Sequence, residues 1–179
     1  MVLKALSRFF RQQPRQPIVG HADGYTQRVQ LEPEVLLHVQ HYRQTSAKAT
    51  EAGGQLFGTV DEALVRIVCA TGPYAGDERT RYRYRSNPAS AQRAVEAKSI
   101  AGLLYLGEWH THAEDHPSAS SLDGDAMTRL IASSKLNSNS LMMLIVGRTI
   151  GPDGLALLTV STGNTLAWVL SALNKDSHP

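Results

Sequence analysis

A chain of 179 residues with 42% hydrophobic and 19% charged residues is long enough to bury the core of one domain and too apolar to be disordered. Its formal net charge of +2 is too small to indicate nucleic-acid binding, and no apolar stretch approaches the roughly 20 residues of a membrane-spanning helix. The single cysteine, Cys69, excludes an internal disulfide, as is typical of the reducing cytoplasm. We therefore expect a cytoplasmic globular protein that binds no nucleic acid and spans no membrane.

The first residues differ in character from the rest of the chain. Four basic residues interrupt the apolar ones over residues 1–15, which predicts a short basic amphipathic helix. Such a helix packs on its own domain, contacts a partner or touches an anionic membrane surface. Prolines and glycines over residues 12–23 indicate a linker. We predict that residues 1–24 form an N-terminal helix and linker, and that residues 25–175 form the domain.

Hydrophobic periodicity predicts a succession of strands and helices along the domain. In chain order we expect a strand over 25–31, a helix from Pro33, a hairpin of strands over 53–60 and 64–71, an alternating strand over 80–86, a helix over 88–101, a strand over 103–112, a helix over 120–136, and strands over 141–146, 155–161 and 166–170. The sheet is then mostly antiparallel with helices around it, which is an α+β or three-layer arrangement.

The most informative segment has the pattern H-x-H-x7-S-x2-D, formed by His110, His112, Ser120 and Asp123. Alternation along a strand places the two histidines on one face. Ser120 and Asp123 fit a capping box at a helix start, where the helix dipole favours an ionised carboxylate. Two imidazoles and one carboxylate leave a fourth tetrahedral position open, which is typical of a catalytic zinc site. We expect one Zn²⁺ per chain, and we interpret His116, in the loop between the ligands, as a surface residue.

With Glu51, this motif resembles the zinc peptidases of the JAB1/MPN/Mov34 family, the JAMM metalloisopeptidases. In that family a glutamate that opens a segment like E-x-x-G-x-L-x-G precedes the motif, and residues 51–58 match that segment. Ala113 stands where family members commonly have proline, a change that bears on loop rigidity and not on metal binding. The run from Tyr105 to His112 is similar to the small stand-alone bacterial JAB peptidases.

The resemblance implies a curved, mostly antiparallel sheet flanked by helices, in a three-layer arrangement like that of cytidine deaminases. It implies an isopeptidase that cuts between the C-terminal tail of a ubiquitin-like or cGAS-like protein and its conjugated target, reversing the work of an E1/E2-like ligase in antiviral defence. Two alternatives stay open. One is a JAB peptidase that processes ubiquitin-like or sulfur-carrier proteins outside defence, and the other is an MPN scaffold without activity.

Two glutamates compete for the role of general acid/base. The family match implies Glu51 in that role, with Ser120 donating a hydrogen bond to the oxyanion. Periodicity offers Glu108, which shares a strand face with His110 and His112 if the strand is regular through all three. Glu108 is alternatively a residue that orients a ligand imidazole.

Arginine alternates with threonine and tyrosine over residues 79–85. In one extended strand this pattern places Arg79, Arg81, Arg83 and Arg85 on a single face. Such a face either protects an edge strand from aggregation or docks an acidic partner or the tail of the conjugated protein.

Overall fold

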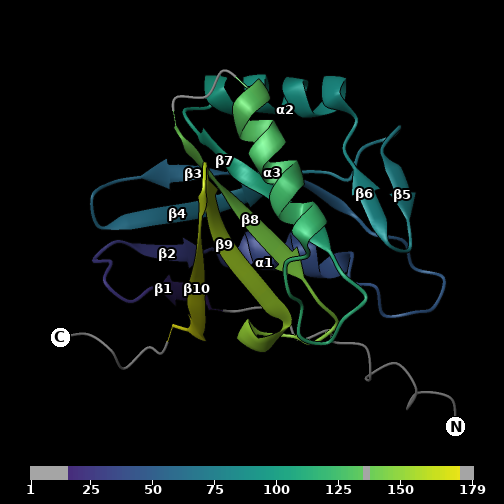
Figure 1. Ribbon diagram of the computed structural model, residues 1–179, viewed down its shortest axis with the longest axis horizontal. Coiled ribbons are helices and arrows are strands. Elements are labelled where there is room, and N and C mark those ends of the chain that lie inside the picture. Colours follow the sequence, from purple (N-terminus) through teal and green to yellow (C-terminus); the bar gives the residue numbers. More distant parts are fainter. Residues whose placement is uncertain (1–15, 135–137, 174–179) are drawn as a thin grey trace, which may run out of the picture.

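In the computed structural model, residues 16–134 and 138–173 are described, and eight of their strands close into a barrel in the order β1-β10-β9-β8-β7-β3-β4-β2 (Figure 1). The barrel strands are β1 (Ile18–His21), β2 (Arg28–Leu31), β3 (Gly53–Val60), β4 (Leu64–Ala70), β7 (Leu104–Thr111), β8 (Ser140–Val146), β9 (Leu155–Ser161) and β10 (Asn164–Ala172). The remaining elements are α1 (Pro33–His41), α2 (Pro88–Ile100), α3 (Ser121–Ser133), the short helix η1 (Pro152–Gly154), and the hairpin strands β5 (Glu78–Thr80) and β6 (Arg83–Arg85).

The expectation of a curved sheet is wrong in one respect, because β1 joins the two edges of the sheet and closes it into a barrel. This strand pairs antiparallel with β2 on one side and with β10 on the other. It lies in the segment that we expected to be a linker. The expected amphipathic helix lies outside the described residues. The remaining pairings are antiparallel except β2 with β4 and β7 with β8, so the α+β character and the mostly antiparallel sheet are as predicted.

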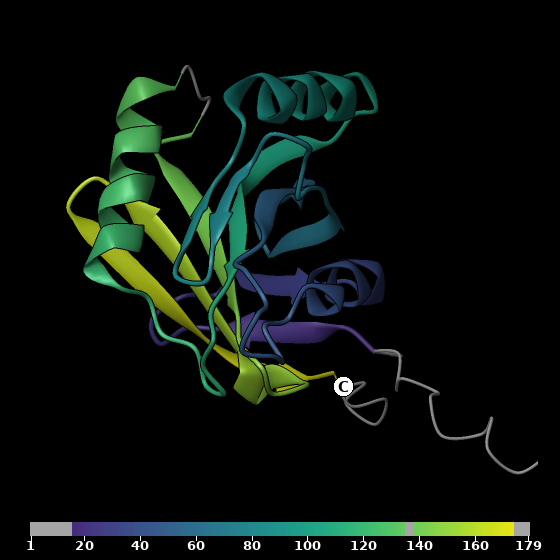
Figure 2. The same cartoon turned by 90° about the vertical axis from the view of Figure 1, so that its right-hand side faces the viewer.

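The single alternating strand expected over residues 80–86 is also wrong. The chain turns at Arg81 and Tyr82, and β5 pairs with β6 as an antiparallel hairpin. Residues directly opposite in such a pair share a face. Arg79 therefore lies with Tyr84 on one face of the hairpin, whereas Arg83 and Arg85 lie on the other. Figures 1 and 2 both place this hairpin beside the first turn of α3.

Strand β8 supplies side chains to two cores. Residues 142, 144 and 146 belong to the main cluster, which fills the barrel and extends under α1, whereas residues 141, 143 and 145 pack under α3. This double burial explains why the strand is a continuous apolar run. None of the helices within the described ranges is long and apolar enough to cross a membrane.

A β-bulge shifts the alternation of β7 just before the metal motif. Leu56 of β3 faces Gly107, but the next residue, Phe57, faces Tyr105, so β7 contains one extra residue at Leu106. Gly107 has a φ of 147°, and a Cβ there would lie 1.9 Å from the carbonyl oxygen of Met142. Only glycine fits this position.

Candidate metal centre and active site

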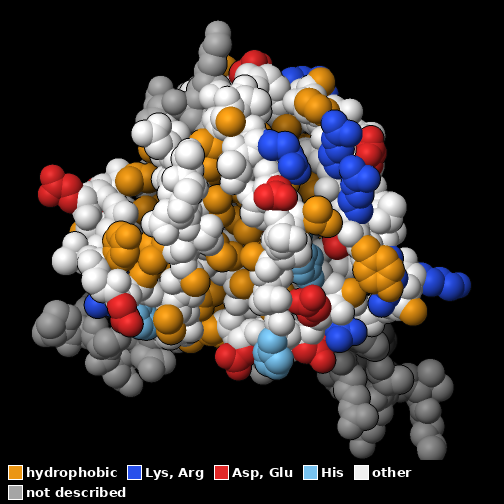
Figure 3. Space-filling view, in the orientation of Figure 1, with side chains coloured by type: hydrophobic (Ala, Val, Ile, Leu, Met, Phe, Trp, Pro, Cys, Tyr) orange, Lys and Arg blue, Asp and Glu red, His pale blue; other side chains and the backbone are white. Residues whose placement is uncertain are grey.

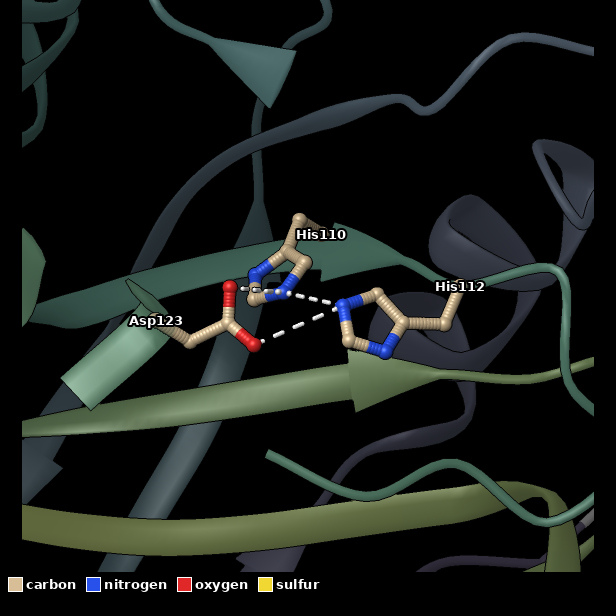
Figure 4. A group of neighbouring side chains, drawn as sticks. All are labelled: His110, His112 and Asp123. Carbon is tan, nitrogen blue, oxygen red and sulfur yellow. Dashed lines mark hydrogen bonds and ion pairs between the residues drawn. The ribbon is translucent and has the colours of Figure 1, made fainter. Parts of the chain in front are cut away.

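Three side chains from β7 and α3 converge on one point. The Nε2 atoms of His110 and His112 lie 3.1 Å apart, and the carboxylate oxygens of Asp123 lie 3.4 Å from His110 Nε2 and 3.6 Å from His112 Nε2 (Figure 4). Ligands bound tetrahedrally to zinc at about 2.0–2.2 Å are separated from one another by about 3.3–3.6 Å. The observed separations are close to those values, so the three donors fit one metal ion without rearrangement.

The inward-facing Thr111 fixes the two histidines on the outer face of the barrel. Its backbone N–H donates to the Ala52 carbonyl at 2.8 Å, and its hydroxyl accepts from the Ala52 N–H at 3.0 Å. Just past the end of β7, the N–H of His112 donates to the Val146 carbonyl at 3.0 Å. Because Trp109 and Thr111 are fully buried, alternation turns the intervening His110, and then His112, away from the core.

The start of α3 forms the capping box that the sequence predicts. The Ser120 hydroxyl donates to Asp123 Oδ2 at 2.6 Å, and the Asp123 N–H donates back to that hydroxyl at 3.2 Å. Burial opposes ionisation of Asp123, but hydrogen bonds from His110 and Ser120 outweigh it and hold the pKa of this carboxyl well below its usual range. Burial and the neighbouring His110 lower the pKa of His112. An anionic carboxylate beside a neutral imidazole is the protonation state that a metal requires.

Glu51 lies next to this cluster. The pairing of Gly53 with His110, continued by two residues, places Glu51 opposite His112 on the same outer face. Its side chain is buried, with 7% exposed. Burial raises the pKa of Glu51 to about 7, with a lowering contribution from His110 and a raising one from Asp123. Two of the three candidate metal ligands, His110 and Asp123, therefore act electrostatically on the Glu51 carboxyl group.

Glu108 shares the outer face of β7 with the histidines, but its carboxylate is engaged elsewhere. One oxygen accepts from the Tyr105 hydroxyl at 2.5 Å, and the other accepts from Gln55 Nε2 at 3.0 Å. Burial raises the pKa of Glu108 to about 7, against the lowering effect of these two bonds. The sequence analysis missed Gln55, although alternation from Glu51 places it on the site face of β3. The side-chain oxygen of Gln55 accepts from the Tyr74 hydroxyl at 2.6 Å.

The four arginines do not form one surface. Arg79 donates from Nε to the Glu51 carbonyl at 2.6 Å, and Arg81 donates to the carbonyls of Ser46 and Ala47 at 3.1 and 2.6 Å. Arg83 and Arg85 are exposed on the outer face of the hairpin. In Figure 3 a histidine side chain is visible between the surface over α3 and the side of the hairpin, where basic side chains gather. His116 is exposed, as expected, and its Nδ1 lies 2.9 Å from the Asp153 carbonyl oxygen.

Comparison with known proteins identifies the family to which a chain with this fold and these metal-ligand candidates belongs. Residues 33–161 match the family of prokaryotic homologs of the JAB domain, and the chain belongs to this family. A CD-NTase/cGAS isopeptidase of Pseudomonas aeruginosa is 38% identical over 108 residues, which cover 59% of this chain and 68% of the relative. A protein of the same description from Escherichia coli is 33% identical, covering 70% of this chain and 80% of the relative.

A further relative described as a CD-NTase/cGAS isopeptidase comes from Vibrio cholerae and is 36% identical, covering 64% of this chain and 72% of the relative. Among solved structures, a Desulfitobacterium hafniense protein matches with a TM-score of 0.56 at 18% identity, covering 76% of this chain and 87% of that one. This structural likeness shows the fold alone.

Proposed function

We propose that the protein is a zinc-dependent isopeptidase that releases a cGAS-like nucleotidyltransferase from a target to which its C-terminus has been conjugated. It would thereby reverse the action of an E1/E2-like ligase in bacterial antiviral defence. The observation that carries the proposal is the convergence of His110, His112 and Asp123, with Glu51 buried beside them. The family and the relatives described as CD-NTase/cGAS isopeptidases support it. A scaffold without activity would not need a complete ligand set together with a buried carboxyl group of raised pKa.

The roles of the residues follow from their positions. His110, His112 and Asp123 would hold the zinc, which when bound lowers the pKa of a water and polarises the scissile carbonyl. Glu51 accepts the proton of the attacking water and passes it to the leaving amine. A carboxyl whose pKa is about 7 exchanges protons readily near neutral pH. Glu108 is a poorer candidate, because both its oxygens already accept hydrogen bonds on the side of Tyr105 and Gln55.

Ser120 stands at the exposed edge of the site. Its hydroxyl proton is directed at Asp123 Oδ2. A hydroxyl has one proton, so donating to the oxyanion requires Oγ–H to rotate away from Asp123. We assign Ser120 this second role in the proposed reaction, where oxyanion stabilisation by one donor is worth up to about 10²–10³ in rate.

The hairpin of β5 and β6 is the part of the protein that we propose selects the substrate. Arg83 and Arg85 are exposed on the outer face of the hairpin and can hold an acidic surface of the conjugated protein, whereas Arg79 and Arg81 bind backbone carbonyls of this chain. An extended C-terminal tail can add to a strand edge through main-chain hydrogen bonds. The proposed substrate is therefore a folded protein with an extended tail rather than a free peptide.

The test is a cleavage assay on a purified conjugate in which the C-terminus of a cGAS-like protein is joined to a lysine amine of a carrier. The wild-type protein loaded with zinc is expected to release both proteins intact, as judged by mass spectrometry. Glu51→Gln is expected to bind the conjugate and to release it about 10²–10⁴-fold more slowly. Binding without release by the wild type would favour the scaffold, and preferential cleavage of a ubiquitin-like conjugate would move the substrate outside the cGAS-like class.

A further inference from the structure

Glu51 occupies a place where the barrel leaves its backbone unpaired. Its neighbour Ala52 turns both hydrogen-bonding groups toward Thr111 of β7. The groups of Glu51 therefore point to the opposite side, along which β4 would continue. However, β4 ends at Ala70, which pairs with Leu56. An unpaired backbone N–H or carbonyl in this buried position would be costly.

The hairpin supplies the missing partners. The Glu51 N–H donates to the Thr80 carbonyl of β5 at 2.7 Å, and the Glu51 carbonyl accepts from Arg79 Nε at 2.6 Å. Tyr84, opposite Arg79 in the hairpin, lies over Gly53 at the start of β3, since a Cβ on Gly53 would lie 2.4 Å from the tyrosine ring. One face of the hairpin thus holds the segment that carries the glutamate.

We propose that Arg79 is a positioning residue for Glu51, an inference that rests on the proposed function. Its guanidinium fixes the orientation of the peptide that follows Glu51, and with it the direction of the carboxylate toward His110 and His112. A cationic donor suits this task because its hydrogen bond to a carbonyl is stronger than that of a neutral donor. Arg79 acts on catalysis through Glu51 and does not touch the substrate, in contrast to Arg83 on the other face of the same hairpin.

The expected kinetic signature follows from this arrangement. A catalytic group displaced by about 1 Å can lose roughly 10²-fold in rate. Arg79→Ala is expected to lower kcat about 10- to 100-fold with little change in KM. Arg83→Ala serves as the contrast, because loss of a docking contact raises KM and leaves kcat unchanged. In a Glu51→Gln background, Arg79→Ala is expected to cost nothing further, since the group that it positions is already gone.

A second readout does not depend on activity. The carbonyl ¹³C resonance of Glu51, measured by NMR in the zinc-free protein, is expected to shift in Arg79→Ala and to stay in place in Arg83→Ala. If Arg79→Ala does not fold, Arg79→Met keeps much of the length of the side chain but has no hydrogen-bond donor, and it is expected to give the same loss of kcat and the same resonance shift.

Three results would overturn the proposal. The first is that the Glu51 carbonyl resonance does not move in Arg79→Ala, and the second is that Arg79→Ala raises KM at constant kcat. The third is that adding Arg79→Ala to Glu51→Gln lowers the residual rate by the same factor as adding it to the wild type. The proposed function fails in a different way, by absence of turnover in the zinc-loaded wild type. The resonance then still shows whether Arg79 holds Glu51.

Discussion

Replacing Glu108 by glutamine is expected to make the stability of the protein less sensitive to pH. The carboxyl is partly buried, and burial raises its pKa from 4.5 to about 7 in spite of the hydrogen bonds from Tyr105 and Gln55. Between these two values the folded protein keeps a proton that the unfolded chain has lost. The free energy of unfolding of the wild type therefore falls as pH rises through this window. Glutamine has no proton to lose, so the variant lacks this decline.

The size of the effect follows from the two pKa values. At about 1.4 kcal/mol per pH unit, the change from 4.5 to about 7 corresponds to roughly 3 kcal/mol. Partial access of water to the side chain reduces this to roughly 1–2 kcal/mol. The stability of Glu108→Gln relative to the wild type is thus expected to increase by about that amount between pH 4 and pH 8. Loss of a hydrogen bond shifts this difference at every pH alike, so the comparison between two pH values isolates the ionisation.

The assay is urea denaturation of both proteins at pH 4 and pH 8, followed by the fluorescence of Trp109 and Trp168. EDTA is included because metal binding would otherwise add its own pH dependence. A stability difference that is the same at both pH values would refute the reasoning and show that the folded environment of Glu108 does not disfavour its charge.

The other predictions concern the metal and the reaction. Purified protein is expected to contain one zinc per chain, and elemental analysis of a His110→Ala, His112→Ala double variant should find none. Glu51→Gln is expected to keep its zinc while losing about 10²–10⁴ in kcat, and full activity would remove Glu51 from its role. Because Glu51 must be ionised to accept a proton and a bound cation favours that form, kcat/KM should rise with pH and level off at or below pH 7, and a rise that continues from pH 7 to pH 8 would contradict this. High salt should raise the KM of the wild type more than that of Arg83→Ala, and equal salt effects would argue against docking through charge.

Local patterns in the sequence were sufficient for much of the fold. The apolar run of β8 and the capping box at Ser120 and Asp123 depend on neighbouring residues, and both are present in the structure. Barrel closure depends instead on β1, a strand of only four residues. Its partner β10 lies far along the chain and begins at Asn164. A short strand flanked by proline and glycine has no pattern that distinguishes it from a linker.

The hairpin of β5 and β6 was missed for a different reason. Alternation of residue types continues through a two-residue turn, and Arg81 and Tyr82 lack the glycine or asparagine that usually marks one. The two glutamates show a further limit, because Glu51 and Glu108 both alternate onto the face of the histidines. In the structure Glu108 accepts hydrogen bonds from Tyr105 and Gln55, whereas His110 and Asp123 act electrostatically on Glu51, and the sequence pattern indicates neither difference.

The extra residue at Leu106 has a consequence for how this family of sequences can change length. Leu106 and Trp109 both belong to the buried core, although an uninterrupted strand would place them on opposite faces. Deleting Leu106 would restore strict alternation without exchanging faces, because Tyr105 already lies opposite Phe57 and Glu108 opposite Gln55. The outward direction of the histidines would be kept, and the loss would be one buried side chain. Loss of a second residue from this part of β7 would then turn the histidines to the other face, whereas loops such as residues 61–63 can gain or lose a residue without affecting the phase of β7.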